Sequence, residues 1–177
     1  TIYDGACEPC HGLGGRGDGP EAARLRIPAT NLTAMRTDRD YVYEMVRDGT
    51  PGTGMPYFRM YDREKLELLL DTMGKRFGMY ADTPPPPRDI SPNSLEVWVD
   101  TCAKCHAGNG SVSATGRAMQ PPPPDFRRSS LTHEQALKII TEGYPGTGMP
   151  AYRNQPQAVR EDLAIISNSF RAAHNKK

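Results

Sequence analysis

The sequence is poor in the features that build a large core or a membrane segment. Only 7% of its 177 residues are aromatic, and no apolar run approaches the roughly 20 residues that a transmembrane helix needs. A formal net charge of +1, with no basic run or stripe, gives no sign of nucleic-acid binding. No segment has the pattern of a secretory signal peptide. Two small domains of this composition would need a staple such as a disulfide, a metal or a cofactor.

Cysteine is also scarce, but its four copies stand in two identical settings. The segments Cys7–His11 and Cys102–His106 both read Cys-x-x-Cys-His. This spacing is typical of covalent c-type haem attachment, because two thiols three positions apart can add to the two vinyl groups on one porphyrin edge. The adjacent imidazole then binds the iron, and the porphyrin supplies apolar surface for the core. The residues predicted to attach and ligate two haems c are Cys7, Cys10, His11, Cys102, Cys105 and His106.

Three other uses of these cysteines compete with haem attachment. Two disulfides would use four thiols, but they do not require a histidine after each pair. One zinc ion could bind two Cys-x-x-Cys pairs, although here they are 95 residues apart and zinc sites seldom need histidines so placed. A thioredoxin-like redox pair needs a βαβ context, and the sequence offers none.

The chain is an internal duplication with an offset of 94–95 residues. Tyr3 and Trp98 both stand four residues before the first cysteine of their motif. Further along, Pro51–Pro56 and Pro145–Pro150 share the sequence Pro-Gly-Thr-Gly-Met-Pro. Repeats of this kind indicate two copies of one structural unit. We therefore predict a first domain over 1–83, a Pro-rich linker over 84–92 that includes Pro84–Pro87, and a second domain over 93–177.

Each repeat predicts the same short helices, and no alternating strand pattern of any length occurs. Thr37–Asp40 and Thr132–Gln135 resemble capping boxes that begin a short amphipathic helix, which Gly49 or Gly143 ends. A closing helix follows in each repeat, so the predicted fold class is all-α. Its apolar face comprises Leu66, Leu69, Leu70, Met73 and Phe77, and Leu163, Ile166 and Phe170 repeat the pattern.

Methionine is the residue we predict as the second axial ligand. Met55 and Met149 lie in the repeated loops, 44 and 43 residues after their histidines, and thioether sulfur suits an electron-transfer iron. His133 and His174 stand in polar surroundings, and we expect them to be solvated. The remaining methionines lack the repeated context and are predicted to be packing residues: Met35, Met45, Met60, Met73, Met79 and Met119.

These motifs resemble the dihaem, two-domain bacterial cytochromes c, which are tandem class I cytochrome c domains, over nearly the whole chain. Cys10–Pro20 is similar to their haem loop. The resemblance implies His11 and Met55 as ligands of the first iron, and His106 and Met149 as ligands of the second. Only six residues precede Cys7, fewer than the family's first helix, so we expect an upstream segment to be missing. The loop after His106 is shorter and less standard than the first one.

The resemblance implies an electron-transfer protein of the periplasm or the extracytoplasmic face of the membrane, not an enzyme. Its partners would be a redox donor, such as a quinol-oxidising complex or dehydrogenase, and a terminal acceptor. One alternative is a dihaem enzyme of the peroxidase or thiosulfate dehydrogenase type, with one open haem. Matched methionines in both repeats argue against it. A non-catalytic cytochrome arm of a larger respiratory complex is compatible with the relay.

Overall fold

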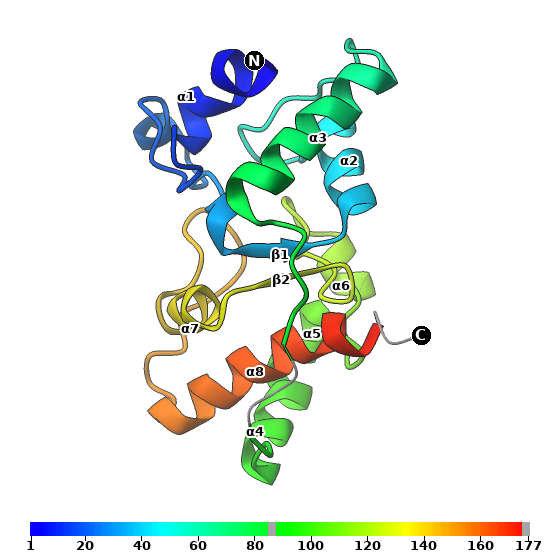
Figure 1. Ribbon diagram of the computed structural model, residues 1–177. Coiled ribbons are helices and arrows are strands. Elements are labelled where there is room, and N and C mark those ends of the chain that lie inside the picture. Colours follow the sequence, from blue (N-terminus) through cyan, green and yellow to red (C-terminus); the bar gives the residue numbers. More distant parts are fainter. Residues whose placement is uncertain (85–87, 175–177) are drawn as a thin grey trace. The chain divides into compact units, whose positions relative to one another are not determined.

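The computed structural model describes residues 1–84 and 88–174, and the chain divides into two compact units, Thr1–Ala81 and Asp82–Lys177 (Figure 1). Helices dominate both units, which confirms the all-α prediction, and each unit also contains a three-residue strand. Of the predicted linker stretch Pro84–Pro87, residues 85–87 lie outside the described part of the chain.

The first unit begins with a helical stretch that ends at the first Cys-x-x-Cys-His motif. Two longer helices, α2 and α3, follow and contact each other (Figure 1). The apolar face predicted for α3 is confirmed, because its five residues are the ones buried on that helix. The elements of this unit are η1 (Tyr3–Cys7, a π-helical turn), α1 (Glu8–His11), the 3-10 turns η2 (Ala22–Arg24) and η3 (Leu32–Ala34), β1 (Met35–Thr37), α2 (Arg39–Asp48) and α3 (Arg63–Phe77).

Local sequence sets the ends of these helices. Gly49 ends α2 with a φ of 74°, and Gly78 ends α3 in the left-handed region, as glycine does most easily. Asp62 caps α3 by accepting a hydrogen bond from the Lys65 backbone N–H. The capping box predicted at the start of α2 is wrong in detail. Asp38 is the N-cap residue, and its side chain makes no capping hydrogen bond.

The second unit repeats this plan with a longer helical approach to its motif. Its closing helix, α8, contacts both α4 and α7. The capping box predicted for α7 is confirmed in part, since the Thr132 side chain accepts from the Gln135 backbone N–H. The elements are α4 (Pro92–Val97), η4 (Trp98–Cys102, a π-helical turn), α5 (Ala103–His106), α6 (Ala114–Arg117), β2 (Ser129–Leu131), α7 (His133–Glu142) and α8 (Gln157–His174).

A hydrophobic cluster joins the helices of the second unit. Trp98 lies in it, and Phe170 packs against it from α8. Beside the cluster, the buried carboxylate of Asp162 on α8 accepts from the Ser94 hydroxyl (2.7 Å) and the Ser91 backbone N–H (3.2 Å) at the start of α4. The N-terminal and closing helices are therefore held by a polar contact as well as by apolar packing. The buried residues of the cluster are Trp98, Ala136, Ile140, Val159, Leu163, Ala164 and Ile166.

Candidate functional site

The first Cys-x-x-Cys-His segment lies on one continuous helical stretch. Cys7 is the last residue of η1, while Cys10 and His11 belong to α1. Helical residues three apart lie on the same face, which places both thiols toward one side. Gly12 ends the stretch with a φ of 77°, a conformation that glycine adopts without strain. Both thiols are free and half-buried, as attachment of one porphyrin edge would require.

The second segment has the same geometry with a strained exit. Cys102 is the last residue of η4, and Cys105 and His106 lie in α5. Where the first motif has Gly12, the second has Ala107, with a φ of 51°. A side chain in this region costs roughly 1–2 kcal/mol. The less standard loop noted in the sequence therefore begins with a strained residue.

The thiols and their surroundings fit a porphyrin better than a zinc ion or a redox dithiol. Burial, helped by the neighbouring thiol of the same motif, raises the pKa of both Cys7 and Cys102 to about 11. A raised thiol pKa is the opposite of the lowered pKa that characterises a reactive dithiol. Within residues 1–84 and 88–174, no three His, Cys, Asp or Glu side chains converge as ligands of one metal ion.

His11 is oriented by a backbone carbonyl. Its Nδ1 lies 3.0 Å from the carbonyl oxygen of Thr30. A carbonyl only accepts, so Nδ1 carries the proton and the Nε2 lone pair remains available for iron. Burial lowers the pKa of His11 despite this hydrogen bond, which favours the neutral, ligating form of the ring.

His106 is held by rings instead. Its side chain is only 8% exposed, and its imidazole stacks on the Phe126 ring with centroids 4.4 Å apart and an interplanar angle of 10°. The Trp98 ring lies 6.3 Å away. Burial lowers the pKa of His106 to about 4, so this imidazole is also neutral. Among the residues that the structure describes, its Nδ1 has no hydrogen-bond partner, in contrast to that of His11.

The aromatic residue that precedes each motif anchors it to the closing helix. In the first unit, the Tyr3 hydroxyl donates to the Gly12 carbonyl (2.7 Å), and its ring packs on Phe77 with centroids 5.1 Å apart. In the second unit, Trp98 packs on Phe170 at 5.4 Å. The repeated aromatic therefore fixes where each motif lies on its unit.

Each Pro-Gly-Thr-Gly-Met-Pro loop is folded by its threonine. In the first loop, the Thr53 hydroxyl accepts from the Met55 backbone N–H (3.1 Å) and donates to the Thr50 carbonyl (2.7 Å). In the second loop, the Thr147 hydroxyl accepts from the Met149 backbone N–H (3.1 Å) and donates to the Tyr144 carbonyl (2.7 Å). This role of the threonine was not identified from the sequence. Its recurrence at the same place in both copies was the available signal.

The helix before each methionine loop fixes the position of that loop. A Cβ added at Gly49 would lie 2.9–3.0 Å from backbone atoms of Met55 and the two residues after it. A Cβ on Gly143 would meet the Met149 backbone at 2.9 Å. Both glycines also have a positive φ. The end of α2 and the end of α7 can therefore lie against the loop only because glycine stands there.

In the second unit, the motif and the methionine loop reach the same part of the core. Cys102 and Met149 both pack against the cluster that contains Trp98. Tyr152, three residues after Met149, also packs against this cluster, and its pKa is raised first by burial and then by the neighbouring Cys102 and Cys105. Met55 and Met149 are each half-buried. Each therefore lies in the unit of its motif, in loops of matching geometry.

The other sequence-predicted residues divide into confirmed and wrong assignments. His133 and His174 are exposed, as predicted. Met60 was predicted to pack but is 66% exposed, so that prediction is wrong. Met119 is half-buried and lies against Gly148, the residue before the ligand candidate Met149.

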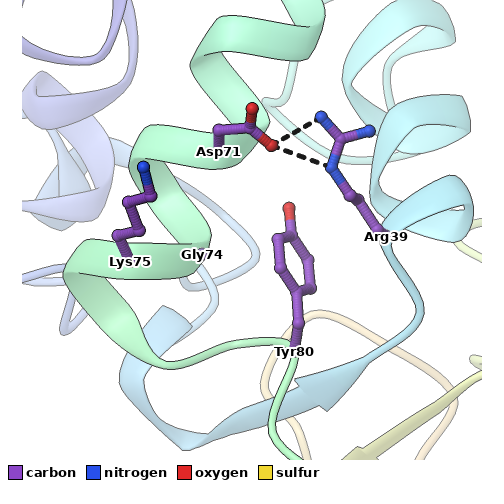
Figure 2. A pocket seen from close by; sticks show the side chains of 5 residues that line it. All are labelled: Arg39, Asp71, Gly74, Lys75 and Tyr80. Carbon is purple, nitrogen blue, oxygen red and sulfur yellow. Dashed lines mark hydrogen bonds and ion pairs between the residues drawn. The ribbon is translucent and has the colours of Figure 1, made fainter.

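A surface hollow of about 260 Å³ lies apart from these residues, on the first unit (Figure 2). None of the motif or methionine-loop residues lines it. In Figure 2 a short β-strand and two helices frame the hollow, with charged groups at its rim. It contributes nothing to either candidate site. The lining residues are Arg39, Asp71, Gly74, Lys75 and Tyr80.

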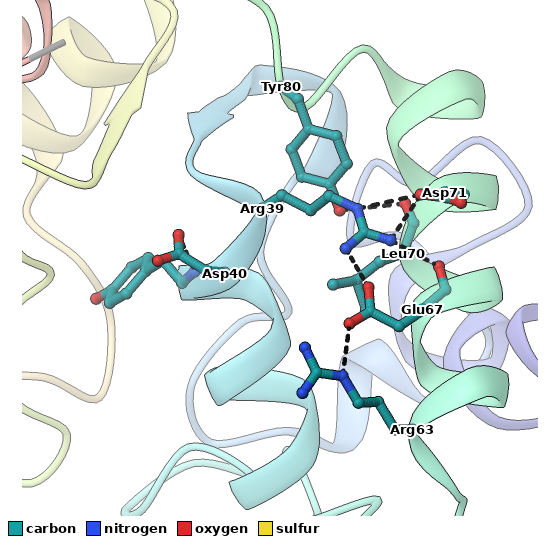
Figure 3. A network of polar contacts seen from close by, with 8 residues as sticks. Arg39, Asp40, Arg63, Glu67, Leu70, Asp71 and Tyr80 are labelled. Carbon is teal, nitrogen blue, oxygen red and sulfur yellow. Dashed lines mark hydrogen bonds and ion pairs between the residues drawn. The ribbon is translucent and has the colours of Figure 1, made fainter.

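A charged network beside this hollow links α2 to α3 (Figure 3). The Arg39 guanidinium bonds to Glu67 and, at 2.7 Å, to Asp71, and Arg63 reaches Glu67 at 3.3 Å. These side chains are partly or largely exposed, and such pairs contribute little to stability because water and salt screen them. The network is a surface brace between the two helices.

Two helical units, each with a Cys-x-x-Cys-His helix and a methionine loop, define the class of protein as a c-type cytochrome. A sequence model of the family described as cytochrome c oxidase, cbb3-type, subunit III matches residues 1–71 and 93–167. The chain therefore belongs to this family, and the two matched regions agree with the tandem cytochrome c domains expected from the sequence.

Neither solved structures nor curated proteins narrow the assignment beyond this family. A chain of the reducing HAO-like protein complex of Kuenenia stuttgartiensis is similar over 96% of this chain and 93% of its own, at 18% identity and a TM-score of 0.43. No curated protein matches the chain. No helix in the described residues is long and apolar enough to cross a bilayer.

Proposed function

We propose that the chain is an electron relay that carries two haems c, one in each unit. In the first unit, Cys7 and Cys10 hold the porphyrin and His11 and Met55 ligate the iron. The matching residues of the second unit are Cys102, Cys105, His106 and Met149. A haem iron between a histidine and a methionine supplies one-electron chemistry at a raised reduction potential.

The matched methionine loops are the observation that carries this proposal. An enzyme needs one iron with a free or labile position. Here both loops share one sequence and one set of hydrogen bonds, made by Thr53 and Thr147. Two methionine loops of the same sequence and hydrogen bonding support the same axial ligation of both irons. Two irons with both axial positions filled favour electron transfer over catalysis.

The donor groups of the chain are prepared for these roles. The imidazoles of His11 and His106 are neutral because burial lowers the pKa of both, so each can bind a metal without first losing a proton. The four thiols are free and half-buried, which keeps them beside an apolar body rather than in bulk water.

Counting haems and sulfur ligands tests the proposal. The pyridine haemochrome assay should give two haems c per chain. In the oxidised protein, the near-infrared methionine-to-iron band should give two equivalents. Met55→Ala and Met149→Ala should each remove one. The control Met60→Ala, at an exposed methionine of the first unit, should keep both. A wild-type value of one equivalent would mean an open haem and would favour a dihaem enzyme of the peroxidase or thiosulfate dehydrogenase type.

Family membership also supports a location and partners. Cytochrome c domains are usually extracytoplasmic, and we place this chain in the periplasm or on that face of the membrane. Its partners are then a redox donor and an acceptor, either as free proteins or as subunits of a respiratory complex in which the chain is the cytochrome arm. Purification from the native membrane separates the two cases. An arm co-purifies with its subunits in fixed ratio, and a free shuttle does not.

A further inference from the structure

The two candidate axial histidines differ in one respect that their identical motifs do not reveal. The Nδ1–H of His11 donates to the Thr30 carbonyl at 3.0 Å. The Nδ1 of His106 is buried and has no hydrogen-bond partner in the described part of the chain. The neighbouring Trp98 Nε1 is also buried without an acceptor. Within residues 1–84 and 88–174, neither of these two buried nitrogens has an acceptor.

A hydrogen bond at Nδ1 changes how strongly Nε2 donates to a metal. An N–H···O=C bond shifts electron density toward the ring and makes the ligating nitrogen more basic. A more basic axial ligand stabilises ferric over ferrous iron, which lowers the reduction potential. An imidazole without that bond is the weaker donor, and its iron is more easily reduced.

We propose that His106 is the weaker donor of the two axial histidines, so that the haem of the second unit has the higher reduction potential. An electron that reaches the chain then resides preferentially on the second unit at equilibrium. This inference rests on the proposed function, because it requires a haem in each unit.

Two further features favour the same order. The His106 ring is stacked on Phe126 and almost fully buried, and a low-dielectric setting disfavours the more highly charged ferric state. The sequence also carries a formal charge of −2 over residues 1–83 and +3 over residues 84–177. A more positive surrounding favours the reduced iron, although salt screens this term.

One contact acts in the opposite direction and is weaker. The Thr50 hydroxyl lies 3.8 Å from the Met55 sulfur, and such a bond would withdraw density from the sulfur and raise the first potential. Hydrogen bonds to sulfur at this distance are second-order effects. The hydrogen bond from His11 Nδ1–H to the Thr30 carbonyl is shorter, at 3.0 Å, and acts on the stronger ligand. We therefore expect it to decide which haem has the higher reduction potential.

The second histidine also differs from the first in the residue that packs against its ring. The two haem loops are anchored alike, because Leu32 N–H donates to the Gly15 carbonyl (2.7 Å) and Phe126 N–H donates to the Gly110 carbonyl (2.8 Å). The anchoring residue differs, however, because it is Leu32 in the first unit and Phe126 in the second. The second unit places an aromatic ring there, and this ring covers the imidazole of His106.

Resonance Raman spectroscopy can read each histidine separately. Met55→Ala and Met149→Ala each open one iron, so the ferrous iron–histidine stretch of the first variant reports His11 and that of the second reports His106. We expect a higher frequency for His11, because a hydrogen-bonded imidazole binds iron more strongly. Equal frequencies, or a higher value for His106, would overturn the proposal.

A potentiometric titration of the intact chain tests the order directly. We expect two one-electron steps whose equilibrium constants differ at least tenfold, which corresponds to 59 mV. Met149→Ala should lose the higher step and Met55→Ala the lower one. A single step, or the reverse assignment, contradicts the inference. If these variants do not fold, the Nδ1–H protons of the reduced wild-type protein decide by NMR, since only that of His11 should show the downfield shift of a hydrogen-bonded proton. A haem count below two would instead refute the proposed function itself.

Discussion

Replacing Gly15 by alanine is expected to cost the first unit about 2–4 kcal/mol of folding free energy. Gly15 has a φ of 71°, where a side chain is strained. An added Cβ would also lie 2.7 Å from two ring carbons of Phe77. Phe77 is only 7% exposed and packs on Tyr3, so its ring has little room to move. The backbone term is about 1–2 kcal/mol and the overlap adds about 1–3 kcal/mol, partly offset by the lost flexibility of the unfolded chain.

Two other glycines of the same unit separate these terms. Gly78 has a φ of 66° and nothing within 4 Å of an added Cβ, so Gly78→Ala carries the backbone strain alone, roughly 1 kcal/mol. Gly5 is helical, exposed and equally open, and Gly5→Ala should stabilise by about 0.5–1 kcal/mol. Placing Gly15→Ala in a Phe77→Leu background should recover about 1–2 kcal/mol through the coupling of the two sites.

Urea unfolding of the haem-loaded chain measures the series. A loss of 2–4 kcal/mol should lower the midpoint by roughly 1–2 M, given a slope of about 2 kcal/mol/M. Far-UV circular dichroism follows both units. Trp98, the sole tryptophan, lies in the second unit, so its fluorescence follows the unfolding of the unit that carries no substitution. If Gly15→Ala costs no more than Gly78→Ala, or if Phe77→Leu recovers nothing, the close approach of the haem loop to α3 is not real and the reasoning fails.

Two smaller predictions concern the second unit. Asp162→Ala should cost roughly 1–3 kcal/mol, because the buried Ser94 hydroxyl loses its carboxylate acceptor and keeps only its contact with the Ser91 hydroxyl. Burial opposes ionisation of Asp162, but hydrogen bonds from Ser94 and Ser91 outweigh it and hold the pKa below the ordinary 3.8. The carboxylate's contribution is therefore present above about pH 4 and lost as the pH falls through the folded pKa; urea midpoints whose wild-type-to-variant gap stayed constant below pH 4 would contradict this. Ala107→Gly should raise stability by about 1 kcal/mol by relieving a φ of 51°, and an unchanged or lower melting temperature would refute that strain.

Periodicity and glycine placement were enough to predict the helices. The buried residues of α3 are the five that recur at helical spacing, because a helix packed on one side buries one stripe. Gly49 and Gly143 end their helices at positive φ, where other residues would be strained. These features depend on a few neighbouring residues, and the sequence pattern contains them in full.

The features that depend on tertiary contacts were not predictable. Met60 differs little in sequence context from a packing methionine, yet it is exposed. Asp38 stands in a capping pattern without making the capping bond. Thr53 folds the methionine loop through two bonds whose geometry only the closed loop provides. Sequence patterns give the residue types available at a site, whereas the final partners depend on how the loop closes.

The two histidines show how the same difference, between what a local motif specifies and what tertiary contacts decide, bears on function. The Cys-x-x-Cys-His motif specifies an imidazole and two thiols twice over, and on that basis the two sites are equal. How strongly each imidazole donates depends on an atom that no side-chain motif encodes, the carbonyl of Thr30, 19 residues beyond His11. Duplication of a motif therefore copies the ligands, while divergence of the loop around Phe126 can alter one reduction potential without changing a ligand. In the proposed relay, two like cofactors would pass electrons, and their unequal potentials would give the transfer a direction.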